Sequence, residues 1–117
     1  MSLEYVTGTE FILANDSIGI SILNTDELPG STRVLIYENA VGGAVLFVDS
    51  GVLTVAPTGT ALIGVSSLNF GFYWLKIYAS SNDLVPTVRF GRVQGGQPVT
   101  FASYSPGDFA VFERSRR

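Results

Sequence analysis

The sequence contains neither cysteine nor histidine. The missing cysteine excludes disulfides, thiolate nucleophiles and sulfur-ligated metals. The missing histidine excludes Ser-His-Asp and Cys-His catalysis, together with histidine-ligated zinc or iron. We therefore expect a protein that is not an enzyme and that holds no metal and no cofactor.

Charge is also scarce. Charged residues make up 15% of the chain, where ordinary soluble domains carry about 25%. Seven basic residues stand against ten acidic ones, and Lys76 is the one lysine. Nucleic-acid binding needs clustered positive charge, so we expect no nucleic-acid partner. With so few charges to solvate the surface, we expect a second copy of the chain to cover part of it, in a homo-oligomer.

Long hydrophobic runs are missing as well. No apolar stretch approaches the roughly 20 residues of a membrane-spanning helix, and Met1–Tyr5 does not resemble a signal peptide. The sequence thus predicts no membrane insertion.

What the chain does have is two-residue alternation, repeated along its length. Ile18, Ile20 and Ile22 alternate with smaller or exposed positions, as a half-buried strand requires. Turn signals such as Gly42-Gly43 and Gly95-Gly96 separate the runs. Other expected strands cover residues 11–14, 32–37, 45–49, 52–56, 61–65, 72–79, 85–92, 98–102 and 109–113. The pattern predicts one antiparallel, jelly-roll-like β-sandwich domain of about eight or nine strands over residues 1–117, with residues 1–4 and 114–117 frayed.

The candidate ligand site lies in the aromatic run Phe72–Tyr78. Alternation places Trp74, Lys76 and Tyr78 on one face of the strand, and Tyr73, Leu75 and Ile77 on the other. If the second set faces the core, the first presents two aromatic rings beside a cation, which could stack against a sugar ring. In the alternative, Trp74 packs in the core and Tyr78 lies in a subunit interface.

Two arginines complete the candidate site. Arg89 and Arg92 would fall on opposite faces of a regular strand, unless Gly91 marks a bulge that brings them together to bind an anionic group. We therefore predict a ligand-binding site formed by Trp74, Lys76, Tyr78, Arg89 and Arg92.

Paired carboxylates offer a minor alternative in which the chain is an enzyme. A glycoside hydrolase needs only two acids about 5–9 Å apart. The candidates are Glu38, Asp49, Asp108 and Glu113. Each also fits a plain role at the end of a strand or in a turn.

Two segments carry a family resemblance. Ile18–Asp26 followed by Ser31–Tyr37, together with Leu53–Pro57, resembles the small bacterial β-sandwich domains related to the sensory rhodopsin transducer. That resemblance implies a cytoplasmic, symmetric homo-oligomer that binds a small polar molecule or a sugar. The chain is also similar to the β-sandwich domains of bacterial spore outer layers, bacterial surfaces and phages, which would make it a structural or assembly domain.

Overall fold

The computed structural model describes residues 2–114, and these form an all-β fold. The strands and one short 3₁₀ helix follow in the order β1 (Ser2–Val6), β2 (Glu10–Ile12), β3 (Ser17–Asn24), β4 (Gly30–Ala40), β5 (Gly43–Asp49), β6 (Leu53–Val55), β7 (Thr60–Val65), β8 (Gly71–Ala79), β9 (Leu84–Gln94), β10 (Gln97–Tyr104), η1 (Pro106–Asp108) and β11 (Ala110–Arg114). This confirms the predicted fold class. The eleven strands of this described part exceed the expected eight or nine, and β1 is the strand that the sequence analysis did not predict.

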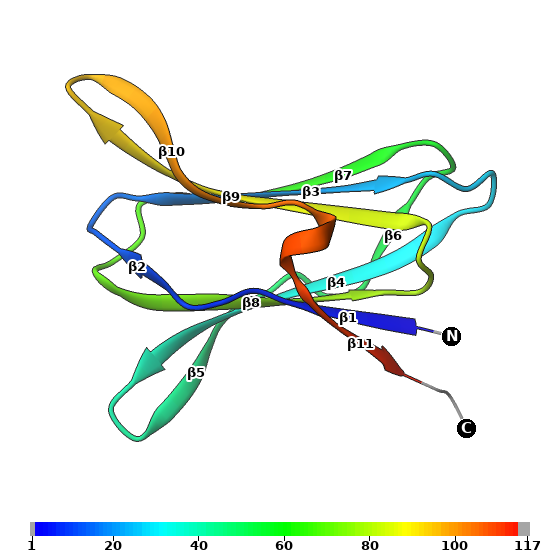
Figure 1. Ribbon diagram of the computed structural model, residues 1–117, viewed down its shortest axis with the longest axis horizontal. Helices are drawn as coiled ribbons and strands as arrows, with labels where there is room; N and C mark the ends of the chain where they lie inside the picture. The colour runs from blue at the N-terminus through cyan, green and yellow to red at the C-terminus, as the bar shows by residue number, and fades with distance from the viewer. Residues whose placement is uncertain (1, 115–117) are drawn as a thin grey trace.

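The strands pack as two antiparallel sheets, one above the other (Figure 1). The larger sheet has the order β11-β1-β8-β4-β5, with β2 also paired to β8 and β6 to β4. The smaller sheet has the order β10-β9-β3-β7. The sandwich thus has β8 near the centre of one layer, and β3 and β9 at the centre of the other.

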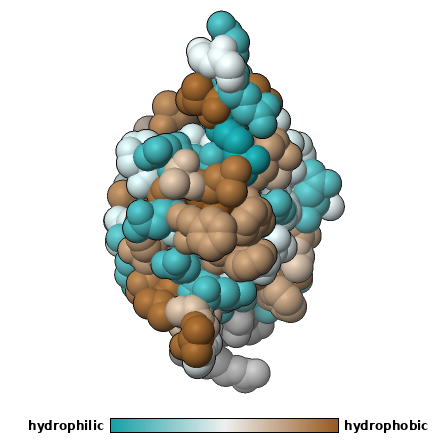
Figure 2. All heavy atoms as spheres, turned by 90° about the vertical axis from the view of Figure 1, so that its left-hand side faces the viewer, coloured by the Kyte–Doolittle hydropathy of each residue, from teal (hydrophilic) through white to brown (hydrophobic). Residues whose placement is uncertain are grey.

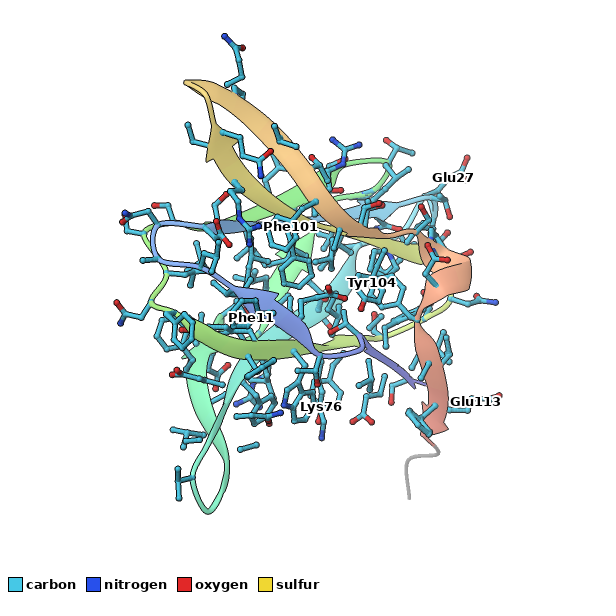
Figure 3. All side chains as sticks on the ribbon, turned by 60° about the vertical axis from the view of Figure 1, so that its left-hand side comes forward. Phe11, Glu27, Lys76, Phe101, Tyr104 and Glu113 are labelled. Atoms are coloured by element: carbon cyan, nitrogen blue, oxygen red, sulfur yellow. The ribbon has the colours of Figure 1, made fainter. Side chains whose placement is uncertain are left out.

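Alternating residues of both sheets fill one core. Tyr73, Leu75 and Ile77 face it from β8, while Ile18, Ile20 and Ile22 face it from β3. Phe101 and Tyr104 of β10 also lie between the two sheets (Figure 3). The predicted alternation is therefore correct for β8 and β3, and it fixes which side chains remain on the outside.

The prediction of a frayed start is wrong for residues 2–4. They belong to β1, which is inserted between β11 and β8, and both Leu3 and Glu4 are buried. Arg114 pairs with Ser2 in the same ladder, so the predicted frayed end does not begin there. Residues 1 and 115–117 lie outside the described residues.

Glycine explains the two hairpin turns as expected. Gly42, Gly43, Gly95 and Gly96 all have positive φ, which L side chains rarely adopt. Gly30 is different, because it begins β4 without a positive φ and a Cβ there would lie 3.0 Å from the Leu84 side chain.

Two hairpins project from the body at the same end of the sandwich (Figure 1). One is formed by β4 and β5, and the other by β9 and β10. Figure 2 looks onto this end: hydrophobic residues gather at its centre, the β9–β10 tip at the top is largely hydrophilic, and the β4–β5 tip at the bottom is hydrophobic.

Candidate functional site

Three of the predicted site residues lie together on the outer face of the larger sheet. Trp74, Lys76 and Tyr78 point away from the core because their neighbours Tyr73, Leu75 and Ile77 fill it. Figure 3 shows the Lys76 side chain on the side of β8 turned away from the smaller sheet. The alternative in which Trp74 packs in the core is therefore wrong.

Tyr37 of β4 completes an aromatic cluster with Trp74. The two residues are direct cross-strand partners, and their rings stack with centroids 4.5 Å apart and planes 15° from parallel. Lys76 Nζ lies 5.7 Å from the centroids of both rings, within the range of a cation–π contact. The indole Nε1 of Trp74 donates a hydrogen bond of 2.9 Å to Asn39 Oδ1. We call Tyr37, Trp74, Lys76 and Asn39 the aromatic platform.

Packing and hydrogen bonding hold the platform in place. Leu35, the cross-strand partner of Lys76, is buried although it belongs to the outer face. The bond to Asn39 fixes the orientation of the indole, which otherwise has freedom about two side-chain torsions. A ligand that binds here therefore meets a largely ordered surface.

A shallow depression of about 280 Å³ lies on the same face, on the Tyr78 side of the platform. It is lined by Tyr78, Arg33, Val52 and the hydroxyl-bearing residues Ser31 and Ser80, among others. Arg33 Nε donates a hydrogen bond of 2.9 Å to Asp49 Oδ1, which lowers the pKa of that carboxyl to about 2. Aromatic, hydroxyl and charged groups therefore occur within one continuous face.

Arg89 lies on the opposite side of the protein. It projects from the outer face of the smaller sheet and lines a depression of about 410 Å³ there. The neighbouring positions on β3 and β7 are Gly19 and Gly64, which form part of the lining. The sandwich therefore separates Arg89 from Trp74, and the prediction that they share one site is wrong.

Arg92 also lies apart from the platform. Its guanidinium hydrogen-bonds Asp16, with Nη2 to Oδ2 at 2.8 Å, and sits 4.3 Å from the centroid of the Phe101 ring. No bulge at Gly91 turns Arg92 toward Arg89; the register shift lies in β10, between Thr100 and Ala102. Arg92 has a structural role at the base of the β9–β10 hairpin.

The four candidate carboxylates are dispersed. Glu38 and Asp49 lie on opposite faces of the larger sheet, as the register of β4 and β5 requires. Asp108 lies in η1 and accepts a hydrogen bond from the Ser105 amide, while Glu113 is on β11, the edge strand farthest from β5. They do not form the acid pair that a glycoside hydrolase needs.

The described residues contain neither an acidic cluster suited to a metal ion nor a membrane-spanning helix. Within residues 2–114, no group of three or more acidic side chains is placed to hold a metal ion. The same part of the chain has no helix with the length and apolar character needed to cross a membrane.

Sequence reasoning missed Tyr37 and Asn39. Both share the outward alternation of Arg33 and Leu35, so the sequence contained the signal for their face. It contained no signal for their register against β8, which lies more than 30 residues farther along the chain.

Comparisons with known proteins inform the fold alone. No protein-family model and no curated protein match the chain. The chain is similar to the crystal structure of Thermotoga maritima 1070, with a TM-score of 0.61 over 92% of this chain and 96% of that one. Sequence identity across this match is 10%. The chain thus shares its β-sandwich fold with a protein of very different sequence.

Proposed function

We propose that the protein is a non-catalytic binding domain that recognises a small polar ring compound, such as a carbohydrate, on its aromatic platform. The observation that carries this proposal is the stacked Tyr37–Trp74 pair with Lys76 beside it, all outside the core. Aromatic rings offer an apolar surface to the flat face of a sugar, and nearby amine and amide groups can bond to its hydroxyls. Such binding needs none of the catalytic groups that the sequence lacks. We propose in addition that the protein is cytoplasmic and that it is related to the sensory rhodopsin transducer domains.

Trp74 makes the proposal directly testable, because it is the single tryptophan of the chain. Titration with a panel of neutral, acidic and amino sugars should change its fluorescence saturably for at least one of them. Tyr37→Ala should then weaken binding of that ligand by about two- to tenfold, since a stacking contact is worth roughly 0.5–1.5 kcal/mol. Calorimetry should measure the affinity, because this substitution also alters the fluorescence of Trp74.

Phe112→Ala provides the matched control. Phe112 is an exposed aromatic on the same outer face, opposite Glu4 in the β1–β11 ladder and two strands from β8. This variant should bind like the wild type. Equal weakening by both substitutions, or no response to any ligand, would refute the platform as a binding site.

A second candidate function is a structural or assembly domain, on a bacterial surface, spore or phage. It is favoured by exposed hydrophobic residues at the end that carries the two hairpins. The Phe11 ring contacts those of Phe70 and Phe72 there, with centroids 5.3 and 5.1 Å apart. Each of the three side chains is at least 43% exposed. Exposed apolar patches of this kind are typical of protein interfaces. This function predicts a stable assembly and no response of Trp74 to small molecules.

A further inference from the structure

The β5 strand has the composition of a buried strand in an exposed position. From Ala40 to Val48 the sequence is uncharged and almost wholly apolar. Continuous apolar runs are typical of strands that are covered on both faces, whereas half-exposed strands alternate. Yet every residue of β5 from Gly43 to Phe47 is exposed, including Val45, Leu46 and Phe47. The isolated chain therefore leaves uncovered a strand whose sequence is suited to burial.

Apolar side chains lie on both faces of β5. Leu46 is opposite Tyr37 and so belongs to the outer face, next to the aromatic platform. Val45 is opposite Glu38 and points to the other side. Phe47 sits at an irregularity in the ladder and packs edge-on against Tyr73, with centroids 5.5 Å apart. Pairing along the strand edge brings side chains on both faces into contact with those of a second strand, which covering a single face would not do.

The free edge of β5 also lacks the usual protection. β5 is the last strand of the larger sheet on its side, and residues 43–48 contain no charge and no proline. Natural edge strands commonly carry lysine or proline to prevent pairing with another strand. Among the other edges, β10 has Pro98 and β11 has Glu113, whereas β7 also lacks charge and proline but alternates exposed and half-buried residues. The β5 edge is thus open to strand addition.

We infer that β5 pairs antiparallel with β5 of a second copy, which extends the larger sheet across both chains. This β5–β5 pairing would form the interface of the homo-oligomer that the shortage of charge predicts. It does not depend on a bound ligand. Charge favours this occupant. The strand is neutral from Gly43 to Val48, and an antiparallel pairing centred near Leu46 places Asp49, its one charged residue, near Gly43 of the other copy. In this register the two Asp49 side chains are not opposed, and each forms an ion pair with Arg33 of its own chain.

The arrangement also has the correct symmetry. Two identical antiparallel strands are related by a twofold axis perpendicular to the sheet, so the interface closes as a dimer. The outer faces of the two copies then point to the same side, and the two aromatic platforms lie on one continuous sheet. β5 becomes a central strand, and its apolar side chains on both faces pack beside those of the other β5.

Light scattering on the full chain tests the inference. The wild type should have at least twice the mass of one chain. Leu46→Lys and Val45→Lys should each raise the dissociation constant by about a hundredfold, because Leu46→Lys opposes two like charges and Val45→Lys sets a charge against the apolar Phe47 of the other copy. The two variants alter opposite faces of β5, and both side chains are exposed in the monomer. Circular dichroism should show that both variants keep the fold.

Leu62→Lys is the matched control. Leu62 is an exposed leucine on β7, an edge strand of the smaller sheet that also lacks charge and proline. This variant should assemble like the wild type. If it dissociates and the β5 variants do not, the interface lies elsewhere, although self-association stands. A wild type that is monomeric at high concentration would overturn both.

A cross-link gives an independent result. Because the chain has no cysteine, single substitutions Val45→Cys and Leu46→Cys can form disulfides only between copies. At least one of them should form a covalent dimer rapidly under mild oxidation, while Leu62→Cys should not. If the Leu62→Cys variant cross-links faster than both, β5 is not the interface.

Discussion

At the scale of single residues, Asp16 is an acid held inside the protein by several donors. Its carboxylate accepts hydrogen bonds from Arg92 and from the Leu13 amide, the latter at 2.8 Å. The bond from Arg92 is the largest cause of its lowered pKa, and burial opposes the shift. Since Arg92 also packs on Phe101, this one carboxylate links the β2–β3 turn to β9 and β10.

Asp16→Asn should destabilise the protein by about 2 kcal/mol at pH 7, because it weakens a charged hydrogen-bonded pair in a largely buried setting. The folded protein has the lower pKa, so the contribution of Asp16 is complete above the unfolded pKa, near 4, and decreases as the pH falls below it. Urea unfolding at pH 7 and pH 3 should therefore show a smaller difference between wild type and variant at pH 3. The control is Asp83→Asn, because Asp83 is half-buried and has no ion pair in the described chain. An equal loss of unfolding free energy in both variants would contradict this account.

At the scale of elements, Asn24 connects the end of β3 to two other segments. Its side-chain amide donates to the carbonyls of Leu28 and Val55, at 2.9 and 3.2 Å, and its Oδ1 accepts from the Asp26 amide. The bond from the Asp26 amide closes an Asx turn at Asn24. The bonds to Leu28 and Val55 extend its role to the start of β4 and to β6.

Asn24→Ala should cost about 2–3 kcal/mol of unfolding free energy, since Asn24 is buried and its loss leaves several backbone groups unpaired. Asn24→Asp should be similarly harmful, because a carboxylate cannot donate to two carbonyls. Thermal and urea unfolding measure both, with the exposed Asn82→Ala as the reference. If Asn24→Asp is as stable as the wild type, donation by the amide is not what stabilises this corner.

The strands also show which features of the fold could be predicted from the sequence and which could not. The alternation of Ile18, Ile20 and Ile22 correctly predicted which face of β3 is buried, because the period of a strand is a local property. Leu3 and Tyr5 alternate in the same way with Ser2 and Glu4, but a five-residue pattern at a chain end is too short to stand out. The pairing of β4 with β8 depends on the packing of the whole sandwich. No local pattern could therefore place Tyr37 beside Trp74, or Arg89 on the opposite side.

At the scale of the whole molecule, one core joins both sheets, so the sandwich should unfold as a unit. Trp74 reports on the larger sheet, whereas far-ultraviolet circular dichroism reports on all strands. We expect the two signals to give the same urea midpoint at a single protein concentration. A fluorescence transition that clearly precedes the loss of circular dichroism would show that the sheets come apart separately.

The neighbouring positions of β1 and β11 have a mechanical consequence. Ser2 pairs with Arg114 at one end of their antiparallel ladder, and Val6 pairs with Ala110 at the other. A force that pulls Ser2 and Arg114 apart breaks these residue pairs one after another, beginning with Ser2–Arg114. It does not load all the pairs at the same time. β11 should therefore peel from the edge under low tension while β1 is still held by β8. When the protein is pulled at these two residues, the sandwich should therefore unfold in steps, beginning with the separation of β11 from β1.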